Sequence, residues 1–129
     1  MLQNSKAFSG FSVDDTEKAK QFYGDILGLN VTQDNNMGGV LTIHVTGGAK
    51  ILAYPKPNHS PATFTILNFL VDNIADSVNQ LKAKGIQFES YDMENFKTDE
   101  DNIFRGGGPL IAWFKDPAGN ILSVIETKA

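Results

Sequence analysis

The sequence predicts an α+β fold made of two tandem βαβββ modules, one over about residues 6–56 and the other over about residues 62–127, in a single domain of 129 residues. The main observation is an internal repeat: the pattern of strand, helix and three strands occurs twice, with Phe11–Asp15 and Phe69–Asn73 at the same point of each copy. A second observation is that two short apolar runs flank the turn cluster Asp116–Asn120, which predicts a closing hairpin. Each module is too short to stand alone, because its sheet must cover an apolar face with its neighbour.

The first module begins with a predicted strand over Lys6–Val13. The run Asp14–Glu17 then indicates a helix start, since a carboxylate stands at the cap position and another lies in the first turn. Apolar residues recur at helical spacing up to Leu27, and Gly28 ends the helix. The helical period then disappears, and glycine-containing turns separate three expected strands over Leu29–Thr32, Val40–Thr46 and Lys50–Tyr54.

The stiff, polar connector Pro55–Pro61 leads to the second module. Here the expected order is a strand over Thr63–Val71, a helix capped by Asp72-Asn73 that ends at Gly85, and a strand over Ile86–Tyr91. The closing hairpin uses the strands Leu110–Phe114 and Ile121–Ile125. Three strands follow each helix without crossover helices, so neither copy is typical of a βαβ nucleotide-binding unit.

The segment Asp92–Pro109 lies between these elements and has no strand or helix pattern. Loops longer than about 12–15 residues are uncommon in compact domains and tend to be lids, binding loops or disordered segments. The position of Phe104 excludes an EF-hand, which requires glycine there, and the glycine run before Pro109 lacks the Lys-Ser/Thr of a P-loop. We expect either a mobile acidic loop that carries Phe96, Phe104 and Arg105, or a solvated connector.

Composition narrows the class of function. The formal net charge is −4 and the pI is near 5.0, which argues against a nucleic-acid partner. The chain has no cysteine, which excludes disulfides, thiolate metal sites and a cysteine nucleophile. The first residues lack a hydrophobic signal core, and no apolar run is long enough to span a membrane, so we expect a cytoplasmic protein.

Two motifs at opposite ends of the chain resemble a known family. The run from Val13 to Leu29, which includes Phe22-Tyr23-Gly24-Asp25-Ile26-Leu27-Gly28, resembles the first half-motif of the glyoxalase I / bleomycin-resistance / extradiol-dioxygenase (vicinal oxygen chelate, VOC) superfamily. The run Phe114–Asn120 resembles its closing motif. The resemblance implies that the two modules form a curved, cup-like mixed sheet, with the helices outside and the site inside. Its members include lyases, ring-cleaving dioxygenases, thiol transferases that act on antibiotics, and proteins that only bind a drug.

The positions that hold the metal in metal-using members of this family carry other residues here. A histidine usually stands five residues before the valine of the first half-motif, and that position is Phe8; its counterpart in the second module is Ile66. A carboxylate usually stands four residues after the closing glycine, where this chain has Ser123, and a further ligand of some members falls near Ile51. Phenyl and alkyl groups cannot bind a divalent ion. We therefore expect no metal and no cofactor.

The alternation of side chains along a strand predicts which other residues lie on the same face as these metal-ligand positions. If Phe8 and Ile66 face the cup, alternate residues of the same strands face it too, and Ser123 joins them from the closing strand. Trp113 resembles a family position that often carries an aromatic ring facing the ligand. The expected site is a mostly apolar, aromatic cavity with a few polar groups. Its predicted members are Phe8, Ser12, Tyr54, Ile66, Asn68, Phe104, Arg105, Trp113 and Ser123.

Three functions stay open on this reading. The first is a metal-free protein that binds a small, partly aromatic molecule in the cup. The second is an enzyme of the superfamily, either with unusual metal donors such as His44, Asp92 or Glu126, or with a metal-free mechanism that would use an acid–base group near the rim of the cup. The third is an interaction module whose sheets pair into a homodimer. We also expect a homodimer for the binding protein, since members of the family build the cup within one chain or across two.

Overall fold

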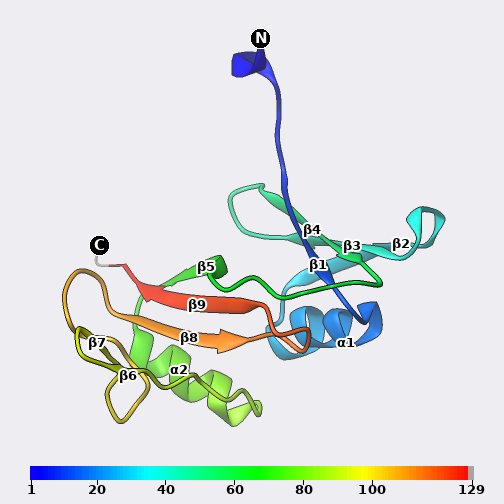
Figure 1. Cartoon of the computed structure of the whole chain (residues 1–129). Helices are drawn as coiled ribbons and strands as arrows, with labels where there is room; N and C mark the ends of the chain where they lie inside the picture. The colour runs from blue at the N-terminus through cyan, green and yellow to red at the C-terminus, as the bar shows by residue number, and fades with distance from the viewer. Residues whose placement is uncertain (128–129) are drawn as a thin grey trace. The chain divides into compact units, whose positions relative to one another are not determined.

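The computed structural model describes residues 1–127 of the chain (Figure 1). The chain forms two compact units, Met1–Pro61 and Ala62–Ala129. Each unit contains a mixed β-sheet with one helical segment, so the α+β fold with two βαβββ-like modules is confirmed. Within residues 1–127, no helix has the length and apolarity needed to cross a bilayer.

The first unit is a four-stranded sheet of order β1-β4-β3-β2, in which β1 runs parallel to β4 and the other pairs are antiparallel. Its helical segment consists of α1 and the π-helical turn η2, and short 3₁₀ turns (η1 and η3) lie before β1 and between β2 and β3. The bounds are η1 Leu2–Asn4, β1 Ser9–Val13, α1 Thr16–Lys20, η2 Gln21–Ile26, β2 Asn30–Asp34, η3 Asn35–Met37, β3 Val40–His44 and β4 Lys50–Pro55.

The predicted helix start is confirmed. Asp15 caps α1, because its Oδ1 accepts a hydrogen bond from the backbone N–H of Lys18 at 3.1 Å. After Lys20 the helix widens into the π-helical turn, where the N–H of Leu27 donates to the carbonyl of Phe22 at 2.9 Å. Gly28 then ends the segment with a φ of 76°, a left-handed conformation that favours glycine.

One face of the first sheet packs against α1 and η2. Phe11 and Val13 of β1 point to this face and are buried, and the Phe11 ring lies 5.8 Å from that of Tyr23 in η2. The opposite face carries Ser12, which is half-buried, and its neighbour across the ladder, Tyr54, which is 40% exposed. The buried core of this unit contains Phe11, Val13, Ala19, Phe22, Tyr23, Leu41, Ile43, Ile51 and Ala53.

The second unit has a three-stranded sheet of order β5-β9-β8, with β5 parallel to β9 and β8 antiparallel to β9, and a separate two-stranded hairpin, β6-β7. Helix α2 begins after Asn73, whose Oδ1 accepts from the N–H of Asp76 at 3.1 Å, and packs against β8 and β9 through Ile74 and Val78. The bounds are β5 Thr65–Val71, α2 Ile74–Ala83, β6 Asp92–Met93, β7 Phe96–Lys97, β8 Ile111–Lys115 and β9 Ile121–Glu126.

The predicted strand over Ile86–Tyr91 was wrong. This segment forms only a single bridge, between Phe88 and Phe114 of β8. The reason lies at Tyr91, whose N–H donates to Thr98 Oγ1 and whose carbonyl accepts from the Thr98 N–H, both at 2.9 Å. These bonds turn the chain away from β8 and tie it to the segment that follows, so a longer ladder along β8 does not form.

The first predicted strand was too long. It begins at Ser9 rather than Lys6, which leaves Phe8 outside the ladder with 69% of its surface exposed. The partner strand sets this limit: Ser9 pairs with Ile51, and β4 begins one residue earlier, at Lys50. Residues 6–8 therefore have almost no partner strand to pair with.

The closing hairpin is confirmed. In its turn, Asp116 Oδ1 accepts hydrogen bonds from the N–H groups of Ala118 and Asn120 at 2.9 Å, and Oδ2 accepts from the Asn120 amide at 3.1 Å. Gly119 has a φ of 86°. Asp116 and Asn120 are only 5% and 2% exposed, so this polar network is part of the interior of the second unit.

Candidate functional site

The candidate site lies on the face of the second sheet that α2 does not cover. Residues paired across a ladder share a face, and Ser123 of β9 pairs with both Asn68 of β5 and Trp113 of β8. These three predicted site residues therefore form one row across the sheet. The opposite face carries buried apolar residues under the helix, among them Phe114 and Leu122.

Trp113 lies across the sheet rather than standing away from it. Its Nε1–H donates to Thr65 Oγ1 at 3.1 Å, and Thr65 belongs to β5, two strands away from β8. Neighbouring strands are about 4.8 Å apart, so the indole must pass over β9 to make this bond. This position explains why Ser123, a polar residue on β9, is 0% exposed.

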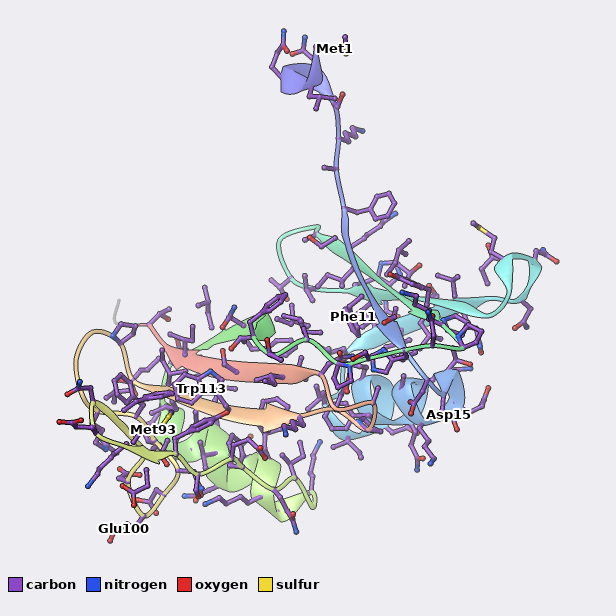
Figure 2. All side chains as sticks on the ribbon, viewed as in Figure 1. Met1, Phe11, Asp15, Met93, Glu100 and Trp113 are labelled. Atoms are coloured by element: carbon purple, nitrogen blue, oxygen red, sulfur yellow. The ribbon has the colours of Figure 1, made fainter. Side chains whose placement is uncertain are left out.

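Three further aromatic rings contact Trp113, which is labelled in Figure 2. Its ring centroid lies 5.5 Å from Tyr91, 5.1 Å from Phe96 and 6.2 Å from Phe104, and the first two contacts are edge-to-face. Such pairs contribute about 0.5–1.5 kcal/mol beyond their buried area. The predicted loop Asp92–Pro109 is thus fixed to the sheet by its aromatic residues. Phe104 was among the predicted ligand-binding residues, whereas Tyr91 and Phe96 were not.

Arg105 does not join the row of Trp113. Its Nε donates to Asp99 Oδ2 at 2.6 Å, while Asp99 Oδ1 accepts from the N–H groups of Asp101 and Ile103 at 2.8 and 2.9 Å. Burial alone would raise the pKa of the Asp99 carboxyl, but the hydrogen bonds from Arg105 and the two N–H groups hold this pKa below its usual value. In this structure Arg105 therefore orders the loop.

The accessible part of the face lies along β5. Asn68 Oδ1 accepts a 2.5 Å hydrogen bond from the Ser123 hydroxyl, which orients the amide, and Asn68 itself is exposed. Leu70, two residues along the same strand, is 70% exposed. An amide group held at its oxygen presents its NH₂ donors outward. This edge of the sheet can therefore offer an apolar surface and hydrogen-bond donors to a ligand.

Two predicted site residues of the first unit, Ser12 and Tyr54, are neighbours within that unit. Ser12 Oγ lies 2.6 Å from His59 Nδ1, and Ser12 pairs across the ladder with Tyr54. The connector returns to this strand end, since the Lys56 N–H donates to the Val13 carbonyl at 3.0 Å. The contact between Ser12 and His59 was not predicted, because 47 residues separate them in the sequence. A hydroxyl bonded to an imidazole can accept, donate or transfer a proton.

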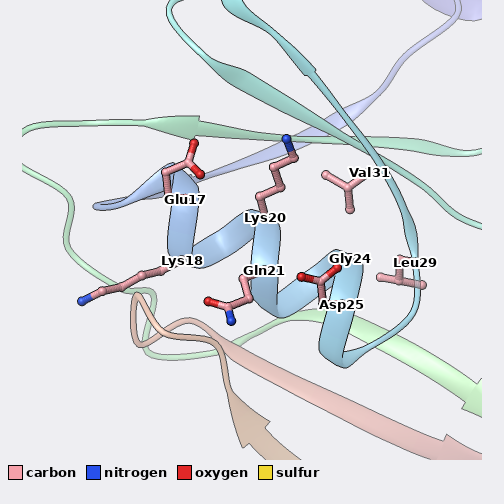
Figure 3. Close-up of a pocket in the computed structure, with 8 residues that line it drawn as sticks. All are labelled: Glu17, Lys18, Lys20, Gln21, Gly24, Asp25, Leu29 and Val31. Carbon is pink, nitrogen blue, oxygen red and sulfur yellow. The ribbon is translucent and has the colours of Figure 1, made fainter.

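A groove in the first unit was not predicted (Figure 3). Its volume is about 560 Å³ and it lies between the α1–η2 segment and β2. Charged side chains of both signs line it together with a few apolar ones, and none of the predicted site residues takes part. The lining residues are Glu17, Lys18, Lys20, Gln21, Gly24, Asp25, Leu29 and Val31.

Comparison with known proteins decides the family. The sequence profile of the Glyoxalase/Bleomycin resistance protein/Dioxygenase superfamily matches residues 9–124, which is nearly the whole chain. The protein belongs to this superfamily. No curated protein sequence matches the chain. The cytoplasmic location expected from the sequence stays a prediction.

Several solved structures share the fold. TnmS3, an antibiotic-binding protein from Streptomyces sp. CB03234, is 20% identical with a TM-score of 0.66, over 98% of this chain and 99% of that one. A glyoxalase family protein from Bacillus anthracis is 19% identical with a TM-score of 0.69, over 99% and 100% of the two chains. The integron cassette protein HFX_CASS4, from the mobile metagenome of a Halifax Harbour sewage outfall, is 19% identical with a TM-score of 0.68, over 95% and 99%.

The metal used by many superfamily members does not fit the residues of this one. Phe8 lies outside β1, and Ile66 stands at the irregularity between Thr65 and Leu67, where β5 slips against β9. Ser123 occupies the carboxylate position and donates its hydroxyl to Asn68. Within residues 1–127, no three side chains of His, Cys, Asp or Glu come close enough together to hold a metal ion. His44, the other histidine, bonds Thr32 Oγ1 at 3.2 Å.

Proposed function

We propose that this protein binds a small, partly aromatic molecule, without a metal ion, on the open face of the β5-β9-β8 sheet. The observation that carries the proposal is the exposure of Leu70, 70% of its surface, two residues from the oriented amide of Asn68 on the same face of the sheet as Trp113. A large apolar side chain on a strand face, next to aromatic rings and a fixed polar group, is typical of a ligand-binding surface.

The residues also suggest the chemistry of the ligand. The NH₂ group of Asn68 can donate to a carbonyl, ether or hydroxyl oxygen, while its own oxygen is held by Ser123. Leu70 and the rings beside Trp113 supply apolar and aromatic contacts. We therefore propose a flat ligand that combines an aromatic ring with a hydrogen-bond acceptor. The antibiotic binding named for TnmS3, which has the same fold, supports a small-molecule ligand.

A titration that follows the fluorescence of Trp113, the one tryptophan of the chain, tests the proposal. We expect saturable quenching or a spectral shift with members of a panel of anthraquinones, naphthoquinones, flavonoids and bleomycin. The substitution Asn68→Asp keeps the shape and the acceptor for Ser123 but replaces the outward donor with a carboxylate oxygen. We expect it to weaken binding about tenfold or more, which corresponds to about 1.4 kcal/mol.

The matched control is Asn79→Asp, which makes the same chemical change at an exposed position of α2. This variant should bind with the affinity of the original protein. If no compound of the panel changes either the fluorescence or the melting temperature, or if the two variants behave alike, the proposed function is wrong.

A further inference from the structure

Ser12 and His59 form a short hydrogen bond on the face of the first sheet that α1 and η2 do not cover. Ser12 Oγ lies 2.6 Å from His59 Nδ1, and both residues are half-buried. A serine hydroxyl is a weak nucleophile by itself, and it is activated by a base within hydrogen-bond reach, about 2.6–3.2 Å away. The pair has this distance, and both of its members keep some contact with solvent.

A backbone turn places His59 beside the strand. The His59 N–H donates to the Lys56 carbonyl at 3.0 Å, and Pro57 stands at the second position of this turn, where its fixed φ is favourable. The Lys56 N–H donates to the carbonyl of Val13, the residue after Ser12, also at 3.0 Å. These two backbone bonds hold the turn at the end of β1 independently of the side-chain contact. The fold itself therefore brings the imidazole to the hydroxyl.

A second hydroxyl–imidazole contact of the same sheet differs in both length and surroundings. Thr32 Oγ1 lies 3.2 Å from His44 Nε2, and this contact is exposed to solvent. Water competes for both groups at an exposed contact, whereas a partly buried hydrogen bond is electrostatically stronger. The Ser12–His59 bond is shorter and partly buried. The contact between Thr32 and His44 therefore serves as a matched control within the same sheet.

The strand surface beside Ser12 has room for a small substrate. Gly10 lies two residues earlier on β1 and on the same face, and it carries no side chain. A Cβ added to Gly10 would lie 3.7 Å from Leu52 Cβ and 3.8 Å from Tyr54 Cε1, so these side chains border the position without filling it. Tyr54 is also the ladder neighbour of Ser12 and is 40% exposed. The surface next to the hydroxyl is therefore apolar and partly aromatic, which suits an acetyl or a benzoyl group.

We propose that Ser12 is a nucleophile activated by His59, and that this pair hydrolyses esters of short or aromatic carboxylic acids. With the imidazole proton on Nε2, Nδ1 accepts the Ser12 hydroxyl proton while Oγ attacks the carbonyl carbon of the ester. The bond from this carbon to the alcohol oxygen breaks, the imidazolium gives its proton to the leaving oxygen, and the acyl group stays on Oγ. A water molecule, deprotonated by the same nitrogen, then attacks the acyl carbon. The bond to Oγ breaks, Ser12 regains its proton, and the carboxylic acid leaves.

Covalent labelling with an alkyl fluorophosphonate, followed by peptide mass spectrometry, tests the nucleophile directly. Attack by Oγ on phosphorus expels fluoride and leaves the phosphonyl group on the serine. We expect the label on the peptide that contains Ser12, and none there in Ser12→Ala. His59→Gln keeps a hydrogen-bond partner for Ser12 but no base, so it should lower the labelling rate about 100-fold or more, since general-base catalysis contributes about 10²–10⁴-fold. Its melting temperature should stay close to that of the original protein.

Hydrolysis of 4-nitrophenyl acetate and 4-nitrophenyl benzoate gives a second readout. Ser12→Ala and His59→Gln should lose this hydrolysis together, whereas Thr32→Ala and His44→Ala should keep both the hydrolysis and the labelling rate of the original protein. Asn68→Asp should keep them too, because Asn68 belongs to the second unit, so a failure here is distinct from a failure of the proposed ligand binding. An original protein that is not labelled at Ser12, a labelling rate unchanged by His59→Gln, or an equal loss in His44→Ala would each overturn the proposal.

Discussion

Asp116→Ala is expected to lower the free energy of unfolding by about 2–4 kcal/mol. The carboxylate of Asp116 is buried and accepts bonds from the N–H groups of Ala118 and Asn120 and from the Asn120 amide. Its removal breaks these three hydrogen bonds, and a buried polar group that loses its bond costs about 1–3 kcal/mol when nothing replaces it. Urea denaturation followed by far-UV circular dichroism measures the loss.

Asp92→Ala is the control for this prediction. The Asp92 carboxylate pairs with Lys97 at 3.4 Å, but its side chain is 86% exposed. Exposed ion pairs contribute little, so we expect a change within about 0.5 kcal/mol. Equal effects of the two substitutions would show that the turn network does not stabilise the closing hairpin.

Trp113→Ala should both destabilise the protein and weaken ligand binding. Trp113 contacts Tyr91, Phe96 and Phe104 and covers Ser123, so truncation opens a cavity between the loop and the sheet. Because the Trp113 side chain is only half-buried, we expect the free energy of unfolding to fall by about 3 kcal/mol, near the lower end of the range for truncating a buried aromatic residue to alanine. Binding of the best compound of the aromatic panel, measured by calorimetry, should weaken at least tenfold.

Trp113→Phe separates the roles of the ring and of its N–H group. It keeps an aromatic contact with the cluster but loses the hydrogen bond to Thr65. We expect both its free energy of unfolding and its affinity for the compound to lie between those of the original protein and those of Trp113→Ala. If Trp113→Ala binds the compound as tightly as the original protein, the ligand does not contact this cluster, and the proposed location is wrong.

Local sequence signals predicted the parts of the fold that local chemistry determines. Asp15 and Asn73 cap their helices as expected, because a side-chain acceptor next to a free N–H acts within three residues. The turn at Asp116 follows from proline, glycine and an aspartate that bonds its own backbone. The row of Asn68 and Ser123 followed from strand alternation combined with the family resemblance.

Contacts between distant segments could not be predicted in this way. The shortened ladder at Phe8 depends on where β4 begins, and the missing strand after Gly85 depends on bonds between Tyr91 and Thr98. The Ser12–His59 contact and the rings around Trp113 likewise join residues whose proximity depends on the folded chain. One signal was available: Tyr91, Phe96 and Phe104 are bulky aromatics in an otherwise polar segment, and such residues need a surface to pack against.

The most direct test combines elemental analysis of the purified protein with calorimetric titration of the best aromatic compound before and after dialysis against EDTA. The account predicts no stoichiometric nickel, zinc, iron or manganese and the same affinity in both titrations. A stoichiometric metal ion whose removal abolishes binding would contradict it.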